Sequence, residues 1–167
     1  MKQIWAPWRM TYIRQDSKNE DCIFCDKLKE GDARLTLVLA QTAHSLVMLN
    51  KYPYNNGHLL LAPKRHTDQL SLLTSEEHQD LSDALRESIN ILQRALNPGG
   101  VNLGMNLGYC AGAGVEDHLH WHVVPRWEGD TNFMPVLGEV RVVPQHLLES
   151  YDLLSPYFKG FLVQEPG

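Results

Sequence analysis

Three histidines stand at every second position in the segment His118–His122. Side chains in a β-strand point alternately to its two faces, so a strand here would place all three imidazoles on one side. Leu119, Trp121 and Val123 would point to the other side and enter a core. The spacing therefore predicts a strand over Leu119–Val124 with an active site or a metal site on its open face, because imidazole acts as nucleophile, proton shuttle or metal ligand near neutral pH.

The rest of the chain predicts an antiparallel sheet around one long helix. Apolar runs bounded by turn residues predict further strands over Leu35–Gln41, Ser45–Asn50, His58–Ala62 and Val101–Leu107. Thr74 and Glu77 are spaced as a capping box, and apolar residues recur behind them at helical spacing until Pro98 and two glycines end the pattern. A C-terminal helix is expected over Pro144–Tyr157. This order of elements indicates an α+β fold with about five antiparallel strands, a long central helix and a C-terminal helix.

Length, charge and cysteine content limit the class of protein. A chain of 167 residues is expected to form one domain over 1–167, with a core at about 20–135, an N-terminal arm at 1–20 and a helical extension at 140–167. A net charge of −5 argues against nucleic acid as the main partner. No stretch has the apolar length of a signal peptide core or a membrane span, which argues against a membrane partner. Three cysteines are too few for a disulfide framework, so a cytoplasmic protein is expected.

The loop that leads into the histidine segment, Gly108–Gly114, is rich in glycine and alanine. Small residues let backbone N–H groups approach a ligand closely, and successive amides form an anion-binding nest. The loop lacks the spacing and the lysine of a Walker phosphate-binding loop, so its signal depends on the histidines beside it. Together the two features favour phosphate as the substrate group, with amides holding its oxygens while an imidazole attacks phosphorus.

Two metal sites compete with that interpretation. His-x-His on a strand is a common way to hold zinc, so the three histidines could form a catalytic zinc site. Cys22 and Cys25 have the spacing of half a structural zinc site, which His66 and His118 could complete as a Cys2His2 set. The alternative for the two cysteines is a surface turn with two reduced thiols.

These motifs resemble the histidine triad (HIT) superfamily of nucleotide hydrolases and transferases. His118–Val124 matches its His-x-His-x-His pattern with apolar trailing positions, and Asn50–His66 is similar to the asparagine-to-histidine segment before its central helix. Cys22–Cys25 resembles a zinc half-site found near the start of many members. Within the superfamily, Gly112–Val136 and the opening Trp5–Ile13 look most like bacterial diadenosine tetraphosphate phosphorylases and their fragile-histidine-triad relatives.

The likeness covers about residues 20–135, and one departure from it bears on the reaction. Most hydrolytic members carry glutamine four residues before the first triad histidine, where this chain has Gly114. That glutamine helps to hold the substrate phosphates. Its absence weakens the case for simple hydrolysis and leaves room for an acceptor such as inorganic phosphate.

The resemblance implies a role for each triad histidine. His120 is the expected nucleophile, which attacks the α-phosphorus of a nucleoside polyphosphate, forms a covalent nucleotidyl-histidine and passes the nucleotide to phosphate or water. His122 is expected to contact the phosphates or the leaving oxygen. His118 either orients the loop or binds a structural zinc, which the chemistry does not need. The alternatives are a hydrolase or phosphoramidase of the same family, a nucleotide-binding regulatory protein with little turnover, and a zinc-dependent hydrolase.

The resemblance also implies a set of substrate contacts. Phosphate oxygens would be held by the loop and its approach, at Asn106, Gly112, Gly114 and Val115. Asn50 would contact the ribose and His58 would support the triad, although both also fit turn chemistry just before a strand. Trp127 would close over the base or a leaving nucleotide, or pack at a strand end. The superfamily is mostly homodimeric, so a homodimer is expected.

Overall fold

Five antiparallel strands form one sheet in the order β1-β2-β3-β5-β4. The computed structural model describes residues 22–29, 31–130 and 146–161. The strands span Val38–Gln41 (β1), Ser45–Leu49 (β2), Leu59–Pro63 (β3), Gly100–Met105 (β4) and Trp121–Arg126 (β5). Within the described sheet, β5 lies between β3 and β4, and β1 and β4 form the edges.

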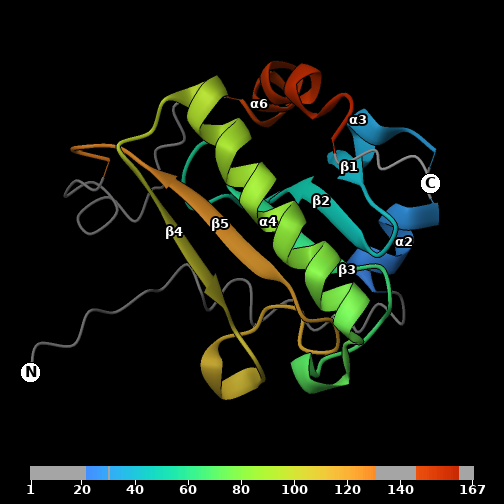
Figure 1. Cartoon of the computed structure of the whole chain (residues 1–167). Helices are drawn as coiled ribbons and strands as arrows, with labels where there is room; N and C mark the ends of the chain where they lie inside the picture. Colours follow the sequence, from blue (N-terminus) through green and yellow to red (C-terminus); the bar gives the residue numbers. More distant parts are fainter. Residues whose placement is uncertain (1–21, 30, 131–145, 162–167) are drawn as a thin grey trace, which may run out of the picture.

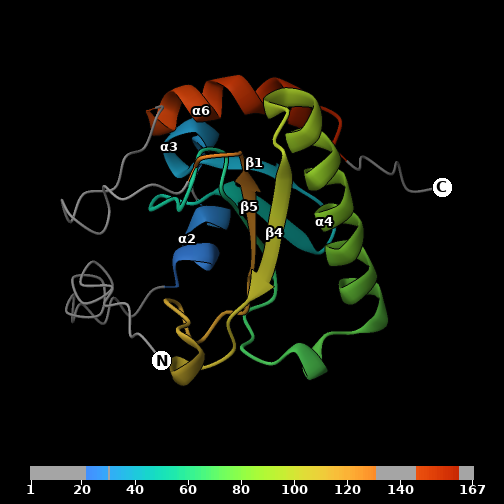
Figure 2. The same cartoon turned by 90° about the vertical axis from the view of Figure 1, so that its left-hand side faces the viewer.

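Helices lie on both faces of this sheet (Figures 1 and 2). The long helix α4 (Ser75–Leu96) packs on one face together with α6 (Leu147–Leu154), and α2 (Ile23–Lys29) lies on the other. The shorter helical turns are α3 (Ala33–Thr36), η1 (Leu70–Leu72), η2 (Tyr109–Ala111) and η3 (Ser155–Phe158). The fold is therefore α+β, as the sequence predicts, and none of its described helices is both long and apolar enough to cross a membrane.

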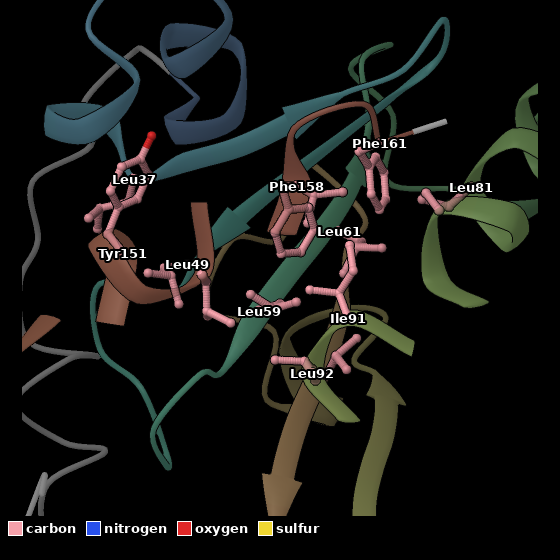
Figure 3. Packing of buried hydrophobic residues seen from close by; sticks show 14 of the residues in the cluster. Leu37, Leu49, Leu59, Leu61, Leu81, Ile91, Leu92, Tyr151, Phe158 and Phe161 are labelled. Carbon is pink, nitrogen blue, oxygen red and sulfur yellow. The ribbon is translucent and has the colours of Figure 1, made fainter. Parts of the chain in front are cut away.

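Two apolar clusters fill the two sides of the sheet. In β3, Leu59 and Leu61 enter the larger cluster beneath α4, while Leu60 enters the smaller cluster beneath α2, as strand alternation requires. Figure 3 shows the close packing of the larger cluster, which reaches from the sheet to α4 and to the C-terminal helical turns. Leu119 and Val123 also lie in the larger cluster, so the predicted inward side of the histidine segment is confirmed.

The long helix α4 begins and ends at the predicted signals. The Thr74 hydroxyl accepts a hydrogen bond from the N–H of Glu77, and the Glu77 carboxylate accepts one from the N–H of Thr74, which closes the capping box. The Arg65 guanidinium adds two hydrogen bonds of 2.7 Å to the same carboxylate. At the other end, Asn97 adopts a left-handed conformation with φ of 44°.

The predicted strand over Leu35–Gln41 is wrong in its first part. Ala33–Thr36 forms α3, because the Asp32 carboxylate accepts hydrogen bonds from the N–H groups of Arg34 and Leu35 and caps a helical turn. Leu37 then turns the chain in a left-handed conformation, with φ of 65°, before β1 begins. A helix cap therefore overrides the apolar pattern at this point.

Other boundaries differ by small shifts. Regular pairing in β5 begins at Trp121 rather than Leu119, and β4 ends at Met105 rather than Leu107. The C-terminal helix runs as α6 followed by η3, and α2 was not predicted. The expected arm at 1–20 lies outside the described residues.

Candidate active site

The three triad histidines lie together on the side of the sheet that carries α2. His122 belongs to β5, while His118 and His120 lie just before it, where the N–H of Leu119 donates to the carbonyl of Thr67 at 2.8 Å. The Phe24 ring of α2 packs against the rings of His118 and His120, each with a centroid separation of 5.0 Å. The rings of His120 and His122 are 4.9 Å apart. All three imidazoles thus share one side, as their spacing predicts.

The tautomer of His120 is fixed by a backbone carbonyl. Its Nδ1 lies 2.9 Å from the carbonyl oxygen of His118, and the side chain is only 3% exposed. A carbonyl oxygen can only accept, so Nδ1 carries the hydrogen. The other ring nitrogen, Nε2, therefore keeps its lone pair, which is the arrangement that a nucleophilic imidazole requires.

The tautomer of His122 is fixed by a chain of donors. The N–H of Tyr54 donates to His58 Nδ1 at 3.0 Å, so the hydrogen of the buried His58 ring is on Nε2. His58 Nε2 lies 3.0 Å from His122 Nδ1 and donates to it. His122 therefore carries its hydrogen on Nε2. We call Tyr54, His58 and His122 the histidine relay, and the Tyr54 ring stacks on that of His122 at 5.7 Å and 15°.

Burial keeps both reactive imidazoles neutral. Removal from water disfavours the charged form and lowers the pKa of His120. Burial, with a smaller contribution from neighbouring His120, lowers the pKa of His122 to about 4. At neutral pH the site thus offers an unprotonated Nε2 on His120 and an N–H donor on His122.

Cys22, Cys25, His66 and His118 form a second group, which we call the cysteine–histidine cluster. One ligand atom from each lies within 4.8 Å of the others. Nδ1 of His118 is 3.2 Å from Sγ of Cys22 and 3.8 Å from Sγ of Cys25, and Nδ1 of His66 is 3.5 Å from Sγ of Cys25. A tetrahedral zinc ion with bonds of about 2.3 Å to sulfur and about 2.0 Å to nitrogen separates its ligands by about 3.5 Å. The group therefore has the composition and spacing of a Cys2His2 zinc site.

His118 links this cluster to the nucleophile. Its Nε2 donates to the carbonyl of Pro63 at 2.8 Å, which leaves Nδ1 free to face the two sulfurs, and its own carbonyl accepts from His120. Burial first, and then the nearby His66 and His120, lower the pKa of His118 to about 4. Among the described residues, the atoms that converge as metal ligands include one triad histidine rather than three. This arrangement disfavours the three-histidine zinc site.

The predicted substrate contacts differ in how they are held. The Asn106 amide donates to the carbonyl of Gly112 at 3.3 Å and ties the glycine-rich loop to the end of β4. Val115 packs against the cluster of Phe24 beneath α2. The Asn50 amide oxygen accepts from the N–H of Tyr52 at 2.9 Å, which is turn chemistry, while its nitrogen lies 3.4 Å from His58 Nδ1.

Two further contacts remain predictions. Gly114 lies in the exposed part of the loop, and the N–H of Trp127, just beyond β5, donates to Asp130 at 3.0 Å.

A groove of about 440 Å³ opens next to His122 on the half of the sheet formed by β4 and β5. Its lining includes Tyr54, Asn55, Asn102, Asn106, Arg126 and Asp130. The sequence alone singled out only Asn106 and the triad histidine of this set. The others converge through contacts between distant segments, and Arg126 and Asp130 were visible only as part of a longer family-like stretch.

A histidine triad beneath a short helix, on a five-stranded antiparallel sheet, defines a class of nucleotide-handling proteins, and comparison places the chain in it. Residues 34–129 match the HIT domain family, so the chain belongs to that family. It is 34% identical over 162 residues to an AP-4-A phosphorylase of Mycobacterium tuberculosis, covering 93% of this chain and 83% of that protein. It is also 34% identical to an adenosine 5′-monophosphoramidase of Schizosaccharomyces pombe, covering 63% of this chain and 74% of that protein.

Solved structures agree with this placement. The fold is similar to that of a Zn-bound histidine triad family protein from Mycobacterium smegmatis, with a TM-score of 0.67 and 25% identity. The match covers 87% of this chain and 99% of that protein.

Proposed function

We propose that this protein transfers a nucleotidyl group from a dinucleoside polyphosphate, of the diadenosine tetraphosphate type, to inorganic phosphate. The observation that carries the proposal is the pair of complementary tautomers at His120 and His122. Similarity to an AP-4-A phosphorylase over most of the chain supports the substrate class. A protein that only binds nucleotides does not require a neutral nucleophile beside a separate N–H donor. The presence of both groups therefore favours an enzyme.

The reaction takes place in two displacements at the α-phosphorus. In the first, Nε2 of His120 forms a bond to phosphorus while the bond to the bridging oxygen breaks, and that oxygen leaves with the electron pair. The Nε2–H of His122 donates to the leaving oxygen as its charge develops. In the second, a phosphate oxygen attacks the same phosphorus, the histidine–phosphorus bond breaks, and diadenosine tetraphosphate plus phosphate has become ATP plus ADP.

Backbone and side-chain donors would hold the phosphates during both steps. We assign this role to Asn106, whose amide already organises the loop, and to the amides around Gly112, Gly114 and Val115. Asn50 would face the ribose and Trp127 the base. The small Gly114 leaves space where hydrolytic members carry glutamine, and this space favours phosphate over water as acceptor.

The cysteine–histidine cluster fits zinc in donor set and in spacing. Cys22, Cys25, His66 and His118 would hold the ion, and its contribution would be structural. Burial, followed by the neighbouring Cys22 thiol, raises the pKa of the Cys25 thiol, so a bound cation is what would stabilise both sulfurs as thiolates. Reduced sulfurs in such a cluster are typical of the cytoplasm, where we place the protein.

We also propose a homodimer formed at the edge of the sheet. β4 is an edge strand of the described sheet, and it exposes 46% of Leu103. Exposed edges with apolar side chains favour pairing with another chain. Light scattering on the purified protein measures this directly, and Leu103→Lys should shift the mass from two chains to one.

Product chromatography tests the reaction. We expect diadenosine tetraphosphate to give ATP and ADP only when inorganic phosphate is present. ATP and AMP formed equally with and without phosphate would identify a hydrolase instead. Release of ammonia from adenosine 5′-phosphoramidate without action on the tetraphosphate would identify a phosphoramidase, the activity that names the Schizosaccharomyces pombe relative.

A further inference from the structure

We propose that the groove beside His122 is a second nucleoside site, which binds the purine nucleoside of the leaving nucleotide. This inference rests on the proposed function, since it concerns the part of the substrate that departs. It assigns substrate specificity to groove residues such as Asn102 and Arg126, which take no part in bond making.

The position of the groove follows from the direction of the reaction. An in-line displacement sends the leaving oxygen away from His120 Nε2. His122 Nε2–H donates to that oxygen, and His122 lines one end of the groove. Arg126 lines the other end, four residues further along β5, which corresponds to about 13 Å of strand. A phosphate chain that starts at His122 therefore leads its nucleoside toward Arg126.

The chemistry of the lining suits a base better than a bare phosphate. Asn102 of β4 lines the groove and faces the same side as His122, since its register partner Val124 stands two residues from His122 along β5. Side-chain amides can pair with the donor and acceptor edge of adenine. Tyr54 supplies an aromatic ring that is 52% exposed, on which a base can stack.

The charges at the far end compensate one another. Arg126 donates to Asp130 through Nε at 2.6 Å and through Nη2 at 2.7 Å, and to Asn102 at 2.8 Å. The Asn55 amide donates to the same carboxylate at 2.7 Å and to the carbonyl of Pro125 at 3.1 Å. Because Asp130 balances Arg126, this end lacks the excess positive charge that a polyphosphate would select. It remains a rigid polar wall with a planar guanidinium, on which a base can also stack.

Gly104 provides a means of closing the groove. It lines the groove between Asn102 and Asn106, and a Cβ built on it meets nothing within 4 Å. Gly104→Phe therefore fills the groove without a clash at Cβ. Gly100→Phe is the matched control, because Gly100 has the same open surroundings on the same strand but does not line the groove.

Two substrates isolate the contribution of the second nucleoside. Diadenosine tetraphosphate and adenosine 5′-tetraphosphate share the adenylyl group and the phosphate chain, and only the first carries a leaving nucleoside. We expect wild-type protein to prefer the first by about tenfold in kcat/KM, the scale of a single base-stacking contact. Gly104→Phe should remove this preference, so that kcat/KM becomes equal for the two substrates, while Gly100→Phe should keep the preference.

The possible failures are distinct. Equal loss on both substrates in Gly104→Phe, or no loss on either, would overturn the second nucleoside site. If Gly104→Phe does not fold or changes its association state, Asn102→Leu decides by the same ratio. Wild-type protein that accepts both substrates equally also overturns the site but leaves the proposed function intact. Wild-type protein that accepts neither contradicts the proposed function and the second site with it.

Discussion

The two sides of His120 are organised by different means. On one side, the cysteine–histidine cluster joins Cys25 of α2 to Cys22 just before that helix and to two loop histidines, and it reaches the nucleophile through the backbone carbonyl of His118. On the other side, the histidine relay is a chain of two hydrogen bonds, from the N–H of Tyr54 to His58 and from His58 to His122. Together they fix the hydrogen of the His122 ring on Nε2. The first side decides which nitrogen of His120 is free to attack. The second decides which nitrogen of His122 carries the hydrogen that is donated. The nucleophile and the proton donor are therefore controlled separately.

Removing the residue between the two sides should have the largest effect. We expect His120→Asn to lower kcat by at least about a thousandfold, because His122 presents an N–H and His118 turns its unprotonated nitrogen to the two sulfurs, so neither can form the bond to phosphorus. Zinc content and nucleotide affinity should stay close to those of the wild type, as measured by metal analysis and calorimetry. Turnover retained in this variant would show that the two sides do not converge on His120.

Breaking the relay should reduce turnover while leaving the metal side unchanged. We expect His58→Leu to lower kcat by about a hundredfold, since His122 loses the donor that fixes its tautomer. His78→Leu is the matched control, because His78 is an exposed residue of α4. Steady-state kinetics on diadenosine tetraphosphate measures both, and equal rates for the two variants would argue against the relay.

Breaking the cluster should reduce stability more than chemistry. We expect Cys25→Ser to lose bound zinc and several kcal/mol of the free energy of unfolding, because ligand binding to a structural site is coupled to folding. The rate should fall by about tenfold, through a less firmly held His118. Cys110→Ser, at an exposed cysteine outside the cluster, should keep its zinc and its stability in denaturant titration. A lower rate without any loss of stability would contradict the structural role of the cluster.

The pH dependence should show the smallest and most specific difference. The pKa of His122 is about 4, below the ordinary value of 6.5, so the acid limb of kcat/KM should lie well below pH 6.5. In His58→Leu that limb should move toward higher pH, because Nδ1 of His122 no longer receives a hydrogen bond. If the acid limb lies at the same pH in both proteins, His58 does not influence the protonation of His122.

The same shift has a consequence for folding. A histidine with a lowered pKa in the folded state binds more protons when unfolded, so its contribution to stability is present above pH 6.5 and is lost as the pH falls toward 4. Thermal unfolding between these values should therefore show a falling midpoint.

The sequence predicts the parts of this molecule that depend on local pattern. Alternation placed Leu119 and Val123 in the core and the histidines opposite, and the capping signals located both ends of α4. Local pattern failed at Leu35, where an apolar run hid a helical turn capped by Asp32. It could not show the relay, since the relay depends on a backbone N–H, or the groove, since Asn55 and Asp130 meet across 75 positions of sequence.

One consequence of the His118 carbonyl concerns how this site tolerates change. The group that selects the reactive nitrogen of His120 belongs to the main chain, so every amino acid placed at position 118 still supplies it. Substitutions at this position will therefore test the metal ligand, but they leave the carbonyl unchanged. An ester linkage between residues 118 and 119 weakens that acceptor but also removes the Leu119 N–H that donates to the carbonyl of Thr67. A second ester between residues 67 and 68, which weakens the Thr67 carbonyl alone, is the comparison that isolates the contribution of the His118 carbonyl to catalysis.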